Sequence, residues 1–350
     1  MAESKKNVAI IFGGKSAEHE VSIRSAGAIY KNIDRNLFNT SLIYINRDGR
    51  WSFIREENIG NPETDTAEKG SFLPWEKSGI ISNDIDIYFP VLHGPNGEDG
   101  RIQGIFEMSG VPFAGAGSLS SNLAMDKVVS KILFEQAGLS ITKYKVYIEN
   151  DPDLIIEEVE SSLGYPCFIK PCALGSSVGI SKAENVRDLV KGINEAFKYD
   201  IKIIIEEAIA GMEYEVSVKG NDVPVASRAG SFIPSKDFYD YEDKYILGKT
   251  EFQIPAELPV DKEDELREAA LTAYRALFLN GFSRVDFFVE EKTGRIIINE
   301  INTIPGFTEI SMFPKLWTTE GLSFKSLITE IINLGFEHSE KIFSRLNKPE

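Results

Sequence analysis

An apolar run at residues 8–12 ends in two glycines, Gly13 and Gly14, and a helical pattern of apolar side chains follows at residues 18–33. This order predicts a strand, a turn and a helix. Two further strands are predicted at residues 41–45 and 85–92, and two further helices at residues 101–108 and 126–137. Alternation of this kind favours an open, largely parallel sheet. The first part of the chain is therefore predicted to be an α/β domain.

The chain has 350 residues, which is too long for one core, because cores stop growing near roughly 250 to 300 residues. We expect an N-terminal α/β domain at 1–125, a compact α+β unit at 126–212 and a third unit at 213–350. The polar stretch at 55–78 is expected to be irregular. Later elements are predicted as strands at 166–170, 201–206, 213–219, 282–289 and 295–301, and as helices at 185–197, 262–278 and 324–334.

The 38 basic and 54 acidic side chains leave a formal net charge of -16. This balance argues against a non-specific grip on nucleic acid or on anionic membranes, because both depend on clustered Lys and Arg. No apolar run approaches the roughly 18 residues of a membrane span, and the N-terminal apolar run is too short for a secretory signal. The two cysteines, Cys167 and Cys172, match no disulfide framework. We therefore expect a cytoplasmic protein that meets anionic substrates with local cations.

The pair of strands predicted at 282–289 and 295–301 carries the strongest chemical signal. Arg284 and Asp286 stand two residues apart in the first strand, and Glu300 and Asn302 stand two apart at the end of the second. Residues two apart share one face of a strand, so a hairpin would place the two carboxylates side by side. Hard oxygen ligands of this kind suit Mg²⁺ held together with phosphates. The alternative is a solvated strand face with an Arg-carboxylate pair.

A glycine- and serine-rich turn from Gly175 to Gly179 follows the strand that ends in Lys170. Such a turn offers backbone N–H groups to phosphates and predicts a flap. Lys127 and Lys170 are candidate point charges for a polyphosphate, although lysines at element ends are more often solvated. The apolar run before Glu206 is equally consistent with an adenine-binding edge or with a buried strand.

Two segments resemble the end of a phosphate-binding P-loop without completing it. Gly14 and Gly248 each precede a Lys-Ser or Lys-Thr pair, but Ala9 and Asp243 stand where the leading glycine belongs. Neither segment is therefore a Walker A motif. The acidic Glu18, which follows a glycine turn, and His93, at a strand end, lie where ligands bind in parallel sheets, although a lone histidine is usually structural.

Taken together, these segments resemble the D-alanine-D-alanine ligases of the ATP-grasp superfamily, from about residue 8 to residue 322. Seven motifs carry the resemblance in order: FGGKSAEHEVS, FPVLHGPNGEDGRIQG, MDK, FIKP with GSSVG, FYDYEDKY, SRVDFF and NEINTIPGFTEIS. The resemblance implies an ATP-grasp fold and ATP-driven joining of two D-alanines. The first carboxylate would attack the γ-phosphate to give an acyl phosphate, which the second amine would attack in turn. The product would serve peptidoglycan synthesis.

The resemblance also implies roles for particular residues. Glu18 would hold the first ammonium near His93, and Glu18, Ser176 and Tyr245 would form a triad that closes the flap over a mobile loop at 235–250. Arg284 and the N–H of Gly306 would form the oxyanion site. Two Mg²⁺ ions, which Mn²⁺ could replace, would be held by the two carboxylates and the amide. The metal residues would be Asp286, Glu300 and Asn302; those meeting ATP would be Lys127, Lys170, Ser177, Glu206, Glu207, Ile209, Glu213 and Lys244; those meeting the second substrate would be Ser311 and Met312.

Two positions bear on the branch of the family. Tyr245 argues against the D-alanyl-D-lactate branch, and Met312 argues against the D-serine branch, which resembles this sequence but carries arginine there. The alternatives are another ATP-grasp carboxylate-amine ligase, such as a D-alanine-D-serine ligase, or an inactive ATP-binding regulatory protein. The resemblance further implies a homodimer.

Overall fold

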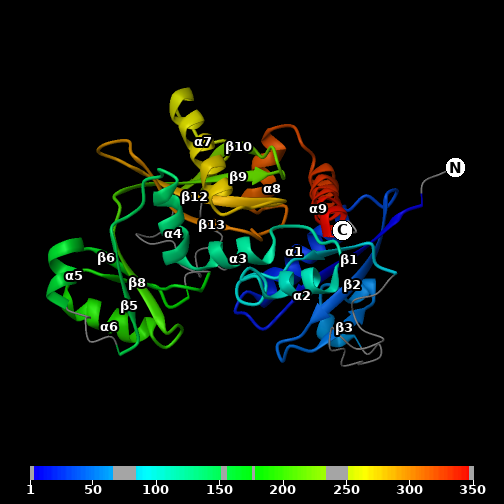
Figure 1. Ribbon diagram of the computed structural model, residues 1–350, viewed down its shortest axis with the longest axis horizontal. Coiled ribbons are helices and arrows are strands. Elements are labelled where there is room, and N and C mark those ends of the chain that lie inside the picture. The colour runs from blue at the N-terminus through cyan, green and yellow to red at the C-terminus, as the bar shows by residue number, and fades with distance from the viewer. Residues whose placement is uncertain (1–3, 66–83, 151–155, 176–177, 234–250, 347–350) are drawn as a thin grey trace.

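The computed structural model describes residues 4–65, 84–150, 156–175, 178–233 and 251–346. Three sheets are built from three successive stretches of the chain. Figure 1 shows the second sheet at one end of the molecule, the third sheet in the middle and the first sheet at the other end. Within the described ranges, no helix is both long enough and apolar enough to cross a membrane.

The first sheet has the strand order β3-β2-β1-β4, in which β1 pairs parallel with both β2 and β4 while β3 is an antiparallel edge. The largely parallel sheet is thus confirmed, with one short strand that the sequence pattern did not predict. Gly13 has a φ of 94°, and a Cβ there would lie 2.2 Å from the carbonyl oxygen of Ile45, so the turn requires glycine. The elements are β1 (Lys6–Gly13), α1 (His19–Asn32), β2 (Phe38–Ile45), β3 (Trp51–Ile54), η1 (Glu56–Asn58), η2 (Pro62–Thr64), β4 (Ile87–Pro90) and α2 (Arg101–Ser109).

The second sheet is antiparallel throughout, with the order β5-β8-β6-β7. Helix α4 enters this region after Asp126, whose carboxylate accepts the N–H groups of Val128 and Val129 at 3.0 and 3.1 Å. This capping starts the helix at Lys127 and so places that lysine at its first turn. The elements are α3 (Ser118–Met125), α4 (Lys127–Gln136), β5 (Tyr144–Ile148), α5 (Ile156–Leu163), β6 (Cys167–Pro171), β7 (Ser181–Ala183), α6 (Val186–Ala196) and β8 (Lys202–Glu207).

The third sheet is also antiparallel, with the order β11-β10-β9-β12-β13. Helices α7 and α8 cover opposite faces, because Ala229 of β10 packs with α7 in one core whereas Gly230 lies against Met312 of α8. The last helix continues twelve residues beyond its predicted end at 334. The elements are β9 (Gly211–Lys219), β10 (Val225–Ile233), β11 (Glu251–Gln253), α7 (Val260–Ala276), β12 (Phe282–Glu290), β13 (Ile296–Asn302), α8 (Met312–Thr319) and α9 (Phe324–Leu346).

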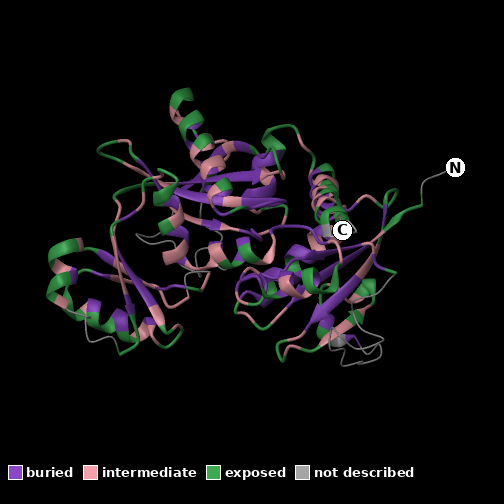
Figure 2. Cartoon of the chain, viewed as in Figure 1, coloured by how far each residue is buried: buried purple, intermediate pink, exposed green. Residues whose placement is uncertain are grey.

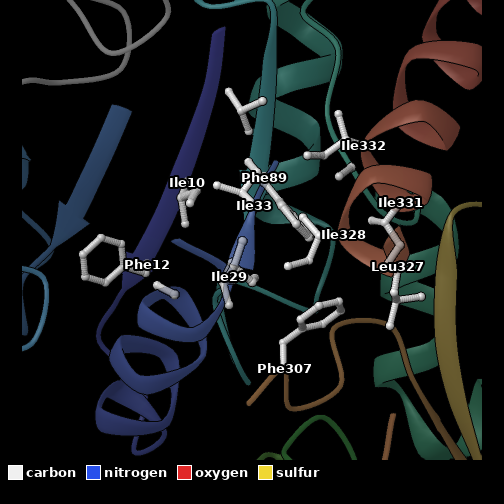
Figure 3. Close-up of a cluster of buried hydrophobic side chains, with 14 of the residues drawn as sticks. Ile10, Phe12, Ile29, Ile33, Phe89, Phe307, Leu327, Ile328, Ile331 and Ile332 are labelled. Carbon is white, nitrogen blue, oxygen red and sulfur yellow. The ribbon is translucent and has the colours of Figure 1, made fainter. Parts of the chain in front are cut away.

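Buried residues follow the strands of the sheets, whereas the outer faces of the helices are exposed (Figure 2). One core joins the two ends of the chain, since it combines strands of the first sheet and helix α1 with helix α9 (Figure 3). Phe307, which lies between β13 and α8, is also buried there. The C-terminal helix therefore packs against the first sheet, with Phe282 of the third sheet in the same core. This core contains Ile10, Ile29, Phe89, Phe307, Leu327, Ile328, Ile331 and Ile332.

Truncation of a side chain in this shared core should destabilise the protein measurably. Ile331 is fully buried, so Ile331→Ala should lower the free energy of unfolding by about 2 to 5 kcal/mol, because the cavity adds to the lost apolar burial. Ile342 lies on the same helix and is 40% exposed, and Ile342→Ala should change it by less than about 1 kcal/mol. Denaturant titrations of both variants would measure this. Equal effects would contradict the shared core.

Candidate active site

Strands β12 and β13 place the polar residues of the predicted hairpin face to face. Arg284 is the partner of Asn302, and Asp286 is the partner of Glu300, which confirms the predicted register. Nε and Nη2 of Arg284 donate to the buried carboxylate of Asp286 at 2.7 and 2.6 Å, and Nδ2 of Asn302 donates to it at 3.0 Å. A β-bulge follows Asp286, and bulges near active sites commonly re-aim side chains.

A second carboxylate faces Arg284, and the sequence had not singled it out. Glu215 of β9 lies 3.1 Å from Nε of Arg284. Burial works to lower the pKa of Arg284, but the carboxylates of Asp286 and Glu215 outweigh burial, and the pKa lies well above its usual value. Arg284 is therefore a permanent cation in the middle of the site.

The donor set of the strand pair consists of two carboxylates and one amide, Asp286, Glu300 and Asn302. In the part of the chain that the structure describes, no group of three or more His, Cys, Asp or Glu side chains could hold a metal ion. The strand pair contains only two such side chains, because Asn302 is an amide. Two carboxylates and an amide nevertheless suit Mg²⁺, whose remaining ligands are usually waters and phosphate oxygens. The chemistry of the residues therefore fits Mg²⁺.

Glu206, at the end of β8, is buried and holds two lysines. Its two carboxylate oxygens lie 2.6 Å from Nζ of Lys131 and 2.6 Å from Nζ of Lys170, and the Thr142 hydroxyl donates to it at 2.7 Å. Burial alone would raise the pKa of Glu206, but the two ammonium groups outweigh burial and hold that pKa well below its usual range. Glu206 is thus a fixed anion between two cations.

Lys127, the first residue of α4, links the strand pair to the glycine turn. Its Nζ lies 3.6 Å from Glu300 and donates to the carbonyl of Leu174 at 2.6 Å. Gly179 has a φ of 72°, and a Cβ there would lie 2.8 Å from Pro171 and from Tyr199, so the end of the turn requires glycine. The lysine therefore lies next to the glycine turn.

Glu18 is buried where the first sheet meets the glycine turn. Its Oε2 lies 2.8 Å from the position that a Cβ of Gly94 would take and 3.6 Å from that of Gly175. The absence of side chains at Gly94 and Gly175 thus leaves room for the carboxylate of Glu18. His93 lies next to Gly94, but its Nδ1 contacts the Ile304 carbonyl at 2.9 Å and its Nε2 contacts the Ser25 hydroxyl at 3.1 Å.

Glu98 also belongs to this junction, although no role was predicted for it. Its carboxylate accepts the N–H of Gly94 at 2.7 Å and the N–H of Ile304 at 3.1 Å. Burial, and after it the neighbouring charge of Glu18, raise the pKa of Glu98 to about 8. Burial also disfavours the charged form of His93 and so lowers its pKa. Both groups are therefore close to neutral at neutral pH.

The segment after β13 brings Gly306 and Ser311 together. A Cβ on Gly306 would lie 3.1 Å from Oγ of Ser311, and that hydroxyl oxygen accepts the N–H of Thr308 at 3.0 Å. Ser311 directly precedes α8, so its surroundings favour a negative charge. The Met312 side chain is buried in a small cluster with Phe232 and Leu316.

The structure thus groups the predicted residues at three neighbouring points: the strand pair, the Glu206 cluster and the junction around Glu18. The carboxylate of Glu207 accepts the N–H of Lys143, which directly precedes β5, at 2.9 Å. Ile209 lies between β8 and β9, and Glu213 lies within β9. Four predicted residues and the loop at 235–250 lie outside the described residues: Ser176, Ser177, Lys244 and Tyr245. Of the predicted flap, the structure describes Gly175, Val178 and Gly179.

Solved structures show which class of protein has this arrangement. The chain is similar to the VanG D-Ala:D-Ser ligase from Enterococcus faecalis, with a TM-score of 0.85 at 38% identity, over 95% of this chain and 100% of that one. It is also similar to the D-alanine-D-alanine ligase from Coxiella burnetii, with a TM-score of 0.87 at 30% identity, over 98% of this chain and 97% of that one. The predicted ATP-grasp fold is thereby confirmed.

The sequence comparisons identify one family. Models of the D-ala D-ala ligase N-terminus and C-terminus match residues 7–116 and 133–333. The D-alanine-D-alanine ligase of Thermoanaerobacter sp. (strain X514) is 46% identical over 96% of this chain and 98% of its own length. That of Geobacillus kaustophilus is 43% identical over 96% of both. The chain belongs to the D-alanine-D-alanine ligase family.

The raised pKa of Glu98 predicts a pH-dependent stability. The folded protein holds a proton on Glu98 up to about pH 8, whereas the unfolded chain releases it near its usual 4.5. The contribution of Glu98 to the free energy of unfolding is therefore full below pH 4.5 and declines as the pH rises towards 8. Unfolding of the protein without nucleotide or metal, followed from pH 4.5 to 8, should show a shallower decline for Glu98→Gln. The exposed Glu149→Gln is the control, and parallel curves for all three proteins would refute the assignment.

Proposed function

We infer that the protein is an ATP-dependent ligase that joins two D-alanines into D-alanyl-D-alanine through an acyl phosphate, for peptidoglycan precursor synthesis. The observation that carries this inference is the meeting of Glu18, Gly175 and the Ile304 backbone at one junction, next to the Arg284 strand pair. An ammonium ion beside Glu18 would offset the cost of burying that carboxylate. The substrates are those of the family, and the buried carboxylate of Glu18 would bind the ammonium of the first one.

ATP would lie between the second and third sheets. Glu206 would accept the adenine amino group, the backbone of Glu207 and Ile209 would contact the same ring, and Glu213 would meet the ribose. Lys127 and Lys170 would contact the phosphates, and Ser177 and Lys244 are proposed from the family for the same purpose. Because Lys170 already lies on Glu206, one cation links the base and phosphate ends of the nucleotide site.

The strand pair would stabilise charge during the reaction. Asp286, Glu300 and Asn302 would hold Mg²⁺, which supplies positive charge to the transferring phosphoryl group when it is bound. Mn²⁺ is the proposed substitute. Arg284 and the N–H of Gly306 would donate to the oxyanion of the tetrahedral intermediate. Ser311 at the start of α8 would bind the carboxylate of the second D-alanine.

The D-serine reaction is the second candidate, because the VanG D-Ala:D-Ser ligase is 38% identical to this chain. Against it stands Met312, whose apolar side chain packs with Phe232 and Leu316. A hydrophobic surface favours a methyl side chain over a hydroxymethyl one only modestly. Tyr245 and Ser176 are proposed to close the flap over either substrate together with Glu18. An inactive ATP-binding protein is disfavoured, because the described part of the site retains its charged residues.

The place and assembly of the protein are further proposals. Both cysteines are free and buried, which suits a reducing compartment, and we propose the cytoplasm. A homodimer is proposed from the family alone. We propose that neither nucleic acid nor a membrane is a partner, as the acidic net charge suggests.

The first experiment is a turnover assay. ADP and phosphate release should require ATP, Mg²⁺ and D-alanine, and mass spectrometry should identify D-alanyl-D-alanine. D-serine, D-lactate and L-alanine serve as parallel second substrates. Faster ligation of D-serine than of D-alanine would transfer the assignment to the second candidate, and no ligation by protein that binds ATP would refute both.

The metal assignment predicts a specific loss at Asn302. Asn302→Ala removes one oxygen ligand and should lower Mg²⁺-dependent turnover about 100-fold or more, the scale of losing one preorganised electrostatic group. Asn302→Asp keeps an oxygen in place and should retain more activity, with an altered Mg²⁺ dependence. Circular dichroism would verify that both variants are folded. Normal turnover of the alanine variant at low Mg²⁺ would remove Asn302 from the metal site.

A further inference from the structure

The segment between β13 and α8 is tied to the N-terminal part of the molecule by three side chains that are more than 200 residues away in sequence. The N–H of Phe307 donates to Oγ of Ser25 at 3.2 Å. His93 contacts the Ile304 carbonyl through Nδ1. Glu98 accepts the N–H of Ile304. Gly306, the proposed oxyanion donor, stands between the two tied residues of this segment, Ile304 and Phe307.

The chemistry of these contacts permits one arrangement of protons. The Ile304 carbonyl can only accept, so Nδ1 of His93 must carry the proton. Because burial keeps His93 neutral, its Nε2 is an acceptor, and the Ser25 hydroxyl donates a hydrogen bond to it at 3.1 Å. The Ser25 oxygen is then free to accept the N–H of Phe307. A directed chain of hydrogen bonds therefore runs from Phe307 through Ser25 and His93 back to Ile304.

The same histidine is connected to the proposed ammonium site. Its backbone carbonyl accepts the Ser16 hydroxyl at 2.7 Å, and the oxygen of that hydroxyl accepts the N–H of Glu18 at 3.2 Å. Glu98 adds a second connection, because it bridges the N–H groups of Gly94 and Ile304. The Glu18 turn and the Gly306 segment are thereby held as one unit.

We propose that Ser25, His93 and Glu98 are positioning residues that set the Gly306 N–H relative to Arg284 and Glu18. This inference rests on the proposed ligase function and deepens it. His93 acts through the backbone of the 304–307 segment and needs no contact with the substrate ammonium. Phe307 anchors the same segment from the other side, since its ring is buried in the shared core.

Ser25→Ala tests the chain without touching a substrate-binding group. Its kcat should fall about 10- to 100-fold, because misplacement of a catalytic group by about 1 Å costs on that scale. The Kd for ATP should stay unchanged. A phosphinate analogue of the dipeptide, phosphorylated on the enzyme as a mimic of the tetrahedral intermediate, should bind more weakly by about the same factor as kcat falls.

Ser120→Ala is the matched control. Ser120 is also a buried serine, and its hydroxyl donates to the Phe278 carbonyl at 2.7 Å, away from the 304–307 segment. This variant should keep its kcat and its affinity for the mimic. His93→Asn places an amide nitrogen near the Nδ1 position but cannot reach Ser25, so it breaks the same link. The double variant with Ser25→Ala should therefore lose little more than the worse single variant.

The outcomes separate the two levels of inference. If the unaltered protein forms no dipeptide, the proposed function fails, and the positioning role fails with it. If it ligates D-alanine normally and Ser25→Ala changes only the melting temperature, the positioning role alone is overturned. Additive losses in the double variant would likewise overturn the chain. Matched losses of kcat and of affinity for the mimic, with ATP affinity intact, would establish the role.

Discussion

The arrangement of the site depends on the packing of the Phe307 ring in the shared core. The centroid of its ring lies within 6 Å of the ring centroids of Phe89, Phe282, Phe313 and Phe324. These rings belong to the core that helix α9 forms with the first sheet (Figure 3). Buried aromatic rings dominate core energetics through the area they remove from water. Because this ring lies between the first and third sheets, the segment that carries Gly306 ends beside Ser25 and His93. The site is thus assembled by a hydrophobic contact.

Charge inside the site is balanced locally, within a chain that is strongly acidic overall. Arg284 is shared by Asp286 and Glu215, and Glu206 is shared by Lys131 and Lys170. Burying such groups costs free energy, which their mutual attraction offsets only where the geometry is good. The pairing keeps each group charged and in place before any substrate arrives. This is the preorganisation that transition-state stabilisation requires.

Much of the site could be predicted, and the reason is periodicity. The alternation in β12 and β13 identified which polar residues share a face, whereas the pairing of Arg284 with Asn302 is set by the register of the two strands. Lys131 and Ser25 were missed, because a polar residue on a helix resembles a solvated one until the helix is packed. The short strands β3 and β7 and the glycine-containing β10 were missed too, since neither length nor alternation distinguishes them from loops.

The succession of strands and helices along the chain, the glycine turns and the residue types of the motifs follow from local sequence, since each depends on a few consecutive residues. The contacts of Glu98 and His93 with Ile304, and of Glu206 with its two lysines, do not, because they join residues dozens to hundreds of positions apart. The pKa of Glu98 shows the difference. Its carboxyl group is ordinary in the sequence, and it becomes a proton-holding group only where packing removes water and brings Glu18 close.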